Sequence, residues 1–104
     1  MTARTRHPWR TKQMRQLFAA IGALRSPEEA EQLLRDLCTR SELEAMAHRL
    51  EVAQLLDRGL PYLEVARRAH ASTTTVTRVA QWLRYGEGGY RRALDRLNKR
   101  AATA

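Results

Sequence analysis

The sequence has little cysteine and no long apolar run. Cys38 is the only cysteine among 104 residues, so no disulfide can form within the chain, and a reducing cytoplasm is the simplest setting. Apolar stretches stay far below the roughly 18 residues of a membrane-spanning helix. The basic N-terminus is not followed by the apolar segment of a signal peptide. These absences predict a cytoplasmic protein with no membrane partner.

Residue patterns typical of enzymes are also missing. The chain has no glycine-rich phosphate loop and no nucleophile motif. His7, His48 and His70 show no metal-ligand spacing with Cys38. Cys38 follows Leu37 in an apolar helical pattern, which favours a small buried side chain over a reactive thiol. We therefore predict a protein that is not an enzyme and that uses neither a metal nor another cofactor.

Aromatic residues are scarce, whereas positive charge is abundant. Aromatics make up 6% of the chain, and few of them are interleaved with basic residues, which disfavours single-stranded DNA or RNA as the partner. Lysine and arginine number 19 against 11 acidic residues, giving a formal net charge of +8. A balance of this kind indicates an anionic partner, with double-stranded nucleic acid ahead of a membrane surface.

The charge is divided unevenly along the chain. Residues 1–15 hold five basic residues and no acidic one, and residues 58–104 hold ten basic and three acidic residues. Residues 26–57 show the opposite balance, with eight acidic residues and three arginines. Such an uneven distribution of charge is expected when one surface of the protein faces phosphate and another does not. We interpret residues 1–10 as a basic, mobile arm and residues 11–100 as a single helical DNA-binding domain.

Apolar spacing and capping residues predict an all-α fold. Met14, Leu17, Phe18, Ile21 and Leu24 recur at steps of three and four residues and form one stripe on a first helix. Serine, threonine and proline at helix starts, and glycines at helix ends, mark the remaining boundaries. The expected helices cover roughly residues 14–24, 27–37, 40–56, 61–69, 72–85 and 90–100, with a left-handed stop at Gly59.

Residues 62–81 fit the pattern of a helix-turn-helix. This motif needs a buried first helix, a tight turn and a second helix whose polar face enters the major groove. With Tyr62 as the first residue, every position that must be apolar or small holds such a residue: Val65, Ala66, Ala69, Ala71, Val76 and Val79. The turn position usually holds glycine, and His70 there is tolerated in the left-handed region with some strain.

The pattern leaves a polar face outside on the second helix. Short hydroxyls lie at its N-terminal end and longer hydrogen-bond donors follow, and both kinds of side chain can contact base edges. Alternatively, clustered serines and threonines only cap helices and fill turns. The predicted base-reading residues are Ser72, Thr73, Thr74, Thr77, Arg78 and Gln81.

Several short motifs resemble the Trp-repressor family. They are Thr39-x-x-Glu42-x-x-Ala45-x-x-x-Arg49, Leu55-Leu56-x-x-Gly59 and Thr75-Val76-Thr77-Arg78, together with Leu83-x-Tyr85-Gly86-x-Gly88-Gly89-Tyr90, which is closer to the YerC/YecD branch. The resemblance covers residues 30–97. It implies a six-helix, Trp-repressor-like bundle that forms an intertwined homodimer and places two recognition helices in successive major grooves.

The resemblance also implies a function and further site residues. The implied function is that of a bacterial, nucleoid-associated transcription regulator that binds specific sites in double-stranded DNA and acts as a repressor. The residues expected near DNA phosphates are Tyr62, Arg67, Arg68 and Arg84. Two alternatives stay open, namely a protein-interaction module that keeps the helix-turn-helix shape and a non-specific nucleic-acid-binding protein.

An effector site is implied by the same resemblance. The Trp repressor binds tryptophan between two arginines that correspond to Arg49 and Arg78, with a threonine that corresponds to Thr39. Val79 replaces a glycine that leaves room for the ligand, and Trp82 replaces a serine at the ammonium end. The indole could also lie over the Arg78 guanidinium, one helical turn away. We predict that tryptophan is not the effector, which leaves any small-molecule effector unidentified.

Overall fold

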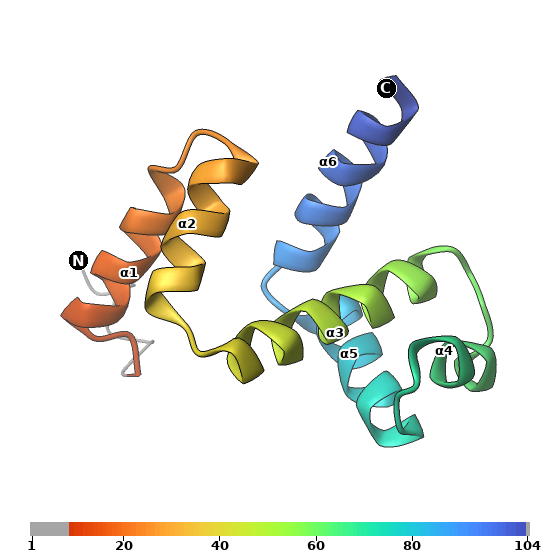
Figure 1. Cartoon of the computed structure of the whole chain (residues 1–104). Helices are drawn as coiled ribbons and strands as arrows, with labels where there is room; N and C mark the ends of the chain where they lie inside the picture. The colour runs from red at the N-terminus through yellow and green to blue at the C-terminus, as the bar shows by residue number, and fades with distance from the viewer. Residues whose placement is uncertain (1–8, 104) are drawn as a thin grey trace. The chain divides into compact units, whose positions relative to one another are not determined.

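The structure is a computed structural model of the chain and describes residues 9–103. Regular structure in this range is entirely α-helical (Figure 1). The elements are α1 (Lys12–Gly22), α2 (Pro27–Leu37), α3 (Arg40–Asp57), α4 (Tyr62–Ala69), α5 (Thr73–Tyr85) and α6 (Gly89–Thr103). The predicted all-α class with six helices is confirmed. Most of the predicted arm, residues 1–10, lies outside the described residues.

Capping side chains explain where several helices begin. Thr11, Ser26 and Ser72 each precede a helix, and each side-chain oxygen accepts a hydrogen bond of 3.1 Å from the backbone N–H three residues later. These bonds satisfy N–H groups that lack a partner in the first helical turn. Glu29 completes the second start by accepting the backbone N–H of Arg25 at 2.8 Å. The predicted starts of the second and fifth helices are thus confirmed.

The chain forms two compact units, one up to Arg40 and one from Ser41 onward. The first unit contains α1 and α2, and neither helix has a buried residue. The predicted apolar stripe of α1 is present but remains 37–47% exposed, and its large residues are Met14, Leu17, Phe18 and Ile21. An amphipathic helix with an exposed apolar stripe has a face that still lacks a partner.

The second unit contains α3 to α6 and holds the hydrophobic core. Each of its helices contributes to the cluster of buried residues, which are Val52, Ala53, Leu55, Val65, Ala69, Val76, Val79 and Leu94. Four of the six apolar positions predicted for the helix-turn-helix are in this cluster, and the other two, Ala66 and Ala71, pack against it partly buried. The core pattern read from the sequence is therefore confirmed, and it fixes which face of α5 is left outside.

The turn between α4 and α5 is left-handed at His70, with φ 52° and ψ 46°. Among the described residues, His70 is the only one besides glycine with a positive φ. The backbone N–H of Ala71 donates to the carbonyl of Ala66 at 2.9 Å and closes the turn. Nε2 of His48, on α3, lies 2.7 Å from the Ala69 carbonyl, which can only accept a hydrogen bond. The predicted left-handed turn at His70 is confirmed, and its strain stays a prediction.

His70→Gly is expected to stabilise the protein by up to about 1.5 kcal/mol. A left-handed residue with a β-carbon costs about 1–2 kcal/mol, and the greater freedom of glycine in the unfolded chain offsets about 0.4–1 kcal/mol of that gain. Urea unfolding measures the difference. His70→Ala is the control, since it removes the imidazole but keeps the β-carbon. A His70→Gly variant that is less stable than His70→Ala would show that the turn carries no strain, because only the greater freedom of glycine in the unfolded chain would then distinguish the two.

Candidate nucleic-acid interface

The helix-turn-helix exposes the polar face of α5. In Figure 1 a short turn joins α4 to α5 within the second unit. The predicted base-reading residues Ser72, Thr73, Thr74, Thr77, Arg78 and Gln81 are all exposed. The first turn of α5 holds no acidic residue, so the partial positive charge of the helix N-terminus is not cancelled there. This end of α5 is suited to a polyanion.

Two of the predicted hydroxyls already have hydrogen-bond partners. Ser72 caps α5 and also donates to Oγ1 of Thr75 at 3.0 Å, which is the capping role weighed as the alternative. The Thr77 hydroxyl donates to the backbone carbonyl of Thr73 at 2.9 Å. Thr77 can therefore offer a base its methyl group or an oxygen lone pair, but not its hydroxyl proton. Base contacts by these residues stay predictions.

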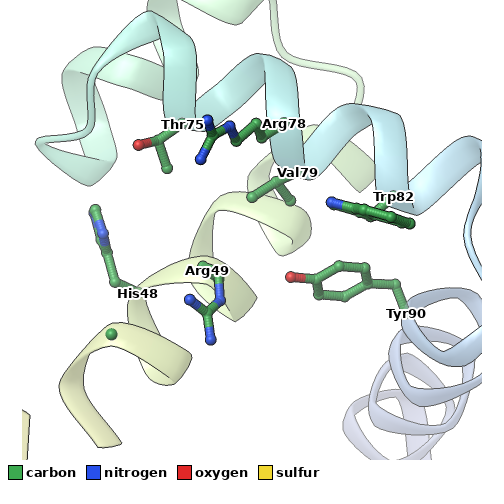
Figure 2. Close-up of a pocket in the computed structure, with 8 residues that line it drawn as sticks. His48, Arg49, Thr75, Arg78, Val79, Trp82 and Tyr90 are labelled. Carbon is green, nitrogen blue, oxygen red and sulfur yellow. The ribbon is translucent and has the colours of Figure 1, made fainter. Parts of the chain in front are cut away.

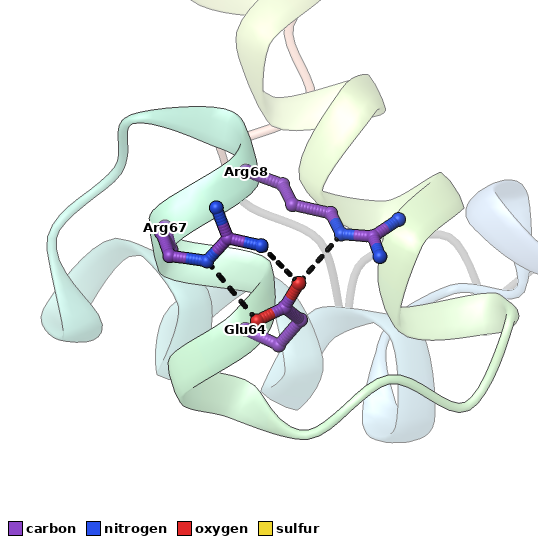
Figure 3. Close-up of polar contacts among 3 residues, drawn as sticks. All are labelled: Glu64, Arg67 and Arg68. Carbon is purple, nitrogen blue, oxygen red and sulfur yellow. Dashed lines mark hydrogen bonds and ion pairs between the residues drawn. The ribbon is translucent and has the colours of Figure 1, made fainter.

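Arg67 and Arg68 share one carboxylate, that of Glu64 (Figure 3). Nε of Arg67 donates to Oε1 at 3.1 Å, Nη2 of Arg67 pairs with Oε2, and Nε of Arg68 donates to Oε2 at 2.7 Å. The hydrogen bonds from Arg67 and then Arg68 lower the pKa of Glu64 to about 2. We call these three residues the Glu64 cluster. Sequence analysis did not predict it, although the spacing of three and four residues is typical of helical ion pairs.

The other two predicted phosphate-contacting residues lie together elsewhere. Tyr62, at the start of α4, and Arg84, in the last turn of α5, line a depression of about 200 Å³. Apolar residues and one glycine form the rest of its wall, and they come from the end of α3, the connection to α4 and α5. The four side chains expected near phosphate are thus grouped as two pairs, one at this depression and one in the Glu64 cluster.

A cavity of about 510 Å³ lies between α3 and α5 (Figure 2). Its lining residues are Ala45, His48, Arg49, Thr75, Arg78, Val79, Trp82 and Tyr90. The two arginines implied by the family resemblance therefore face one space. Within residues 9–103, neither guanidinium forms an ion pair. Thr39 belongs to the first unit, so its predicted place at this site stays a prediction.

The two residues expected to occupy the effector site differ in exposure. Val79 is 2% exposed and belongs to the core, whereas Trp82 is 63% exposed. In Figure 2 the Arg78 guanidinium extends toward Thr75, while the Trp82 indole lies on the side of Tyr90. The predicted stacking of the indole on Arg78 is therefore not found. Both residues line the cavity, but space remains beside them.

Other kinds of site were sought in the described part of the chain. No group of three or more histidine, cysteine, aspartate or glutamate side chains there could hold a metal ion. None of its helices is both long and apolar enough to cross a membrane. Cys38, expected to be buried, is only half-buried at the end of α2.

The Trp repressor protein family matches residues 12–98 of the chain. The chain belongs to this family. A relative in Bacillus subtilis, the uncharacterized protein YerC, is 41% identical over 90 residues, which are 86% of either chain. The predicted family and its YerC-like branch are therefore confirmed, and the family is one of non-enzymatic helix-turn-helix DNA-binding regulators.

Solved structures show the same fold. A TrpR-like protein from Eubacterium eligens superimposes with a TM-score of 0.79 at 38% identity, covering 88% of this chain and 95% of that one. A chain from Staphylococcus aureus, provisionally assigned as a Trp repressor, gives a TM-score of 0.78 at 36% identity and covers 88% and 92%. The predicted Trp-repressor-like arrangement of helices is thus confirmed.

Proposed function

We propose that the protein is a sequence-specific, double-stranded DNA-binding transcription regulator that acts as a repressor in the bacterial cytoplasm and nucleoid. The observation that carries this proposal is the exposed polar face of α5, behind which Val76 and Val79 are buried in the core. A helix whose inner face is packed into the core can present its outer face to the major groove without unfolding. The six predicted base-reading residues, which are Ser72 at the N-cap and five residues of α5, would read the bases, and the two phosphate-contacting pairs would fix the position of α5.

We infer that the working form is a homodimer in which residues 11–100 act as one DNA-binding domain. The apolar stripe of α1 supports this, since four large residues are 37–47% exposed on a chain of only 12.0 kDa. A second copy of the chain could cover this stripe symmetrically. Two-fold symmetry would place the two recognition helices about one turn of DNA, roughly 34 Å, apart.

Selection of bound genomic fragments, followed by footprinting, tests the proposed function. The expected result is one recurrent site with two-fold symmetry and half-sites about one helical turn apart. Preference for that site should persist at about 0.15 M salt. A protein-interaction module would enrich no fragment, and a non-specific binder would lose its binding at this salt without showing a preferred site. Either outcome would contradict the proposal.

Free L-tryptophan is expected to leave DNA affinity unchanged. Val79 adds a β-branched side chain beside Arg78, and Trp82 lines the same cavity, so we expect the two side chains to narrow the space open to a free indole. Calorimetric titration should therefore stay silent up to millimolar ligand. Trp82→Ser is the comparison variant, because it removes the indole from the cavity wall. It should fold normally, since Trp82 is largely exposed. Micromolar tryptophan binding by the unmodified protein, with tightened operator binding, would contradict the prediction.

A further inference from the structure

Glu64 is an unusual residue for the surface on which it lies. It is the only acidic residue between Asp57 and Glu87, a stretch that contains five arginines and the whole helix-turn-helix. A carboxylate beside DNA phosphates repels them and lowers affinity. The position of Glu64 on α4 therefore needs an explanation in terms of its neighbours.

The neighbours of Glu64 are the two arginines expected to contact phosphate. Both carboxylate oxygens are engaged, since Arg67 uses its Nε and Nη2 edge and Arg68 uses its Nε. The Glu64 side chain is 30% exposed, whereas those of Arg67 and Arg68 are 69% and 48% exposed. The carboxylate thus lies behind guanidinium groups that still present N–H donors to solvent. Glu64 is ionised at neutral pH like any glutamate of ordinary pKa, and its lowered pKa extends the ionised form into acidic solution.

This arrangement has two effects on phosphate binding. The Glu64 cluster carries one net positive charge instead of two, which weakens attraction to any DNA. The bidentate contact of Arg67 and the single hydrogen bond of Arg68 also restrict these long side chains, so less conformational freedom is lost when phosphates bind in the matching position. The reduced charge weakens binding to all DNA sequences. The restricted side chains favour binding only where α4 is held at a fixed place on the DNA backbone.

We propose that Glu64 is a specificity-determining residue, which weakens indiscriminate phosphate binding by Arg67 and Arg68 while orienting both guanidiniums for the preferred site. This inference rests on the proposed function, because only base contacts from α5 would hold α4 at one place. Glu64 is a positioning residue in this scheme, and it acts on DNA through the two arginines.

Glu64→Gln tests the proposal, because glutamine keeps the size of the side chain and removes its charge. The matched control is Glu51→Gln, which makes the same change of charge at an exposed residue of α3 that has no ion pair in the described part of the chain. Affinity is measured over a range of salt for the selected operator and for a random-sequence duplex. Thermal unfolding checks that both variants fold.

For Glu64→Gln we expect random-duplex affinity to rise several-fold, with a salt dependence steeper by about one unit of slope. Operator affinity should rise less, so the ratio of specific to random binding falls several-fold. Glu51→Gln should leave that ratio unchanged. Should Glu64→Gln not fold, Glu64→Asp keeps the charge but shortens the side chain, and it should lower operator affinity without changing the salt slope.

Each other outcome overturns the proposal in a distinct way. If Glu64→Gln and Glu51→Gln changed the ratio of specific to random binding equally, Glu64 would act only through the net charge of the protein. If Glu64→Gln lowered affinity equally for the operator and the random-sequence duplex, the role of Glu64 would be limited to stabilising α4. If the unmodified protein has no preferred site, the proposed function fails. The salt slopes on the random duplex then still decide whether Glu64 screens Arg67 and Arg68.

Discussion

Phe18→Asp is expected to convert the protein from dimer to monomer and to weaken operator binding by at least about two orders of magnitude. Phe18 lies on the apolar stripe of α1 and is 47% exposed in the single chain. Complete burial of a side chain of this kind stabilises by about 1.5–3 kcal/mol, and the interface can bury only the half that is still exposed. A two-fold interface buries it twice, so its loss costs about 1.5–3 kcal/mol, and the burial of two carboxylates raises the total to about 3–6 kcal/mol. The dimer dissociation constant should then rise by about two to four powers of ten.

Sedimentation at micromolar concentration measures this change directly. Gln16→Asp is the matched control, since it adds the same charge to α1 at a position opposite the stripe. The Gln16 variant should remain dimeric and should bind the operator normally. A stable folded monomer of 12.0 kDa for the unmodified protein would remove the basis for the dimer proposal. So would a Phe18→Asp variant that sediments as a dimer.

Helix boundaries were predictable from the sequence because their causes are local. A serine at the start of a helix bonds an N–H three residues away, as Ser26 and Ser72 do. Gly59 adopts φ 84° and ends α3, as expected of a residue without a β-carbon. The buried face of the helix-turn-helix was predictable too, since helical periodicity places Val65, Val76 and others on one side.

The side-chain partners at the site were not predictable in the same way. A serine or threonine hydroxyl can form a hydrogen bond with the backbone, a neighbouring side chain or DNA, and these bonds have similar energies. The partners of Ser72 and Thr77 therefore depend on their surroundings in the folded protein. The cavity beside Arg49 and Arg78 depends on how α3 packs against α5. The Glu64 cluster is the exception, because its spacing on one helix was visible in the sequence.

Arg68→Ala and Thr77→Ala are expected to weaken operator binding in different ways. Arg68 contributes charge through the Glu64 cluster, which becomes electrically neutral without it. Removing Arg68 should lower affinity alike for all sequences and flatten the salt dependence by about one unit of slope. Thr77 lies on the exposed face of α5 and contributes no charge, so its loss should leave the slope unchanged.

Thr77→Ala is expected to cost about 1–3 kcal/mol on the best operator and to relax base preference at particular positions. The Thr77 hydroxyl proton is held by the Thr73 carbonyl, which leaves the methyl group as the main group facing DNA. A methyl group in the major groove can contact the methyl of thymine. Thr77→Val, which keeps the methyl and removes the hydroxyl, should therefore retain the preference. Thr77→Ser, which does the reverse, should lose it.

Competition binding against operators substituted one base pair at a time separates these variants. A Thr77→Ala effect confined to one or two symmetric positions would identify the base pairs that Thr77 reads. If Thr77→Ala and Arg68→Ala both lowered affinity uniformly, the assignment of α5 to bases and α4 to phosphates would be wrong. If Thr77→Val behaved like Thr77→Ala while Thr77→Ser kept the preference, the hydroxyl would be the reading group. It would then have to leave the Thr73 carbonyl when DNA binds.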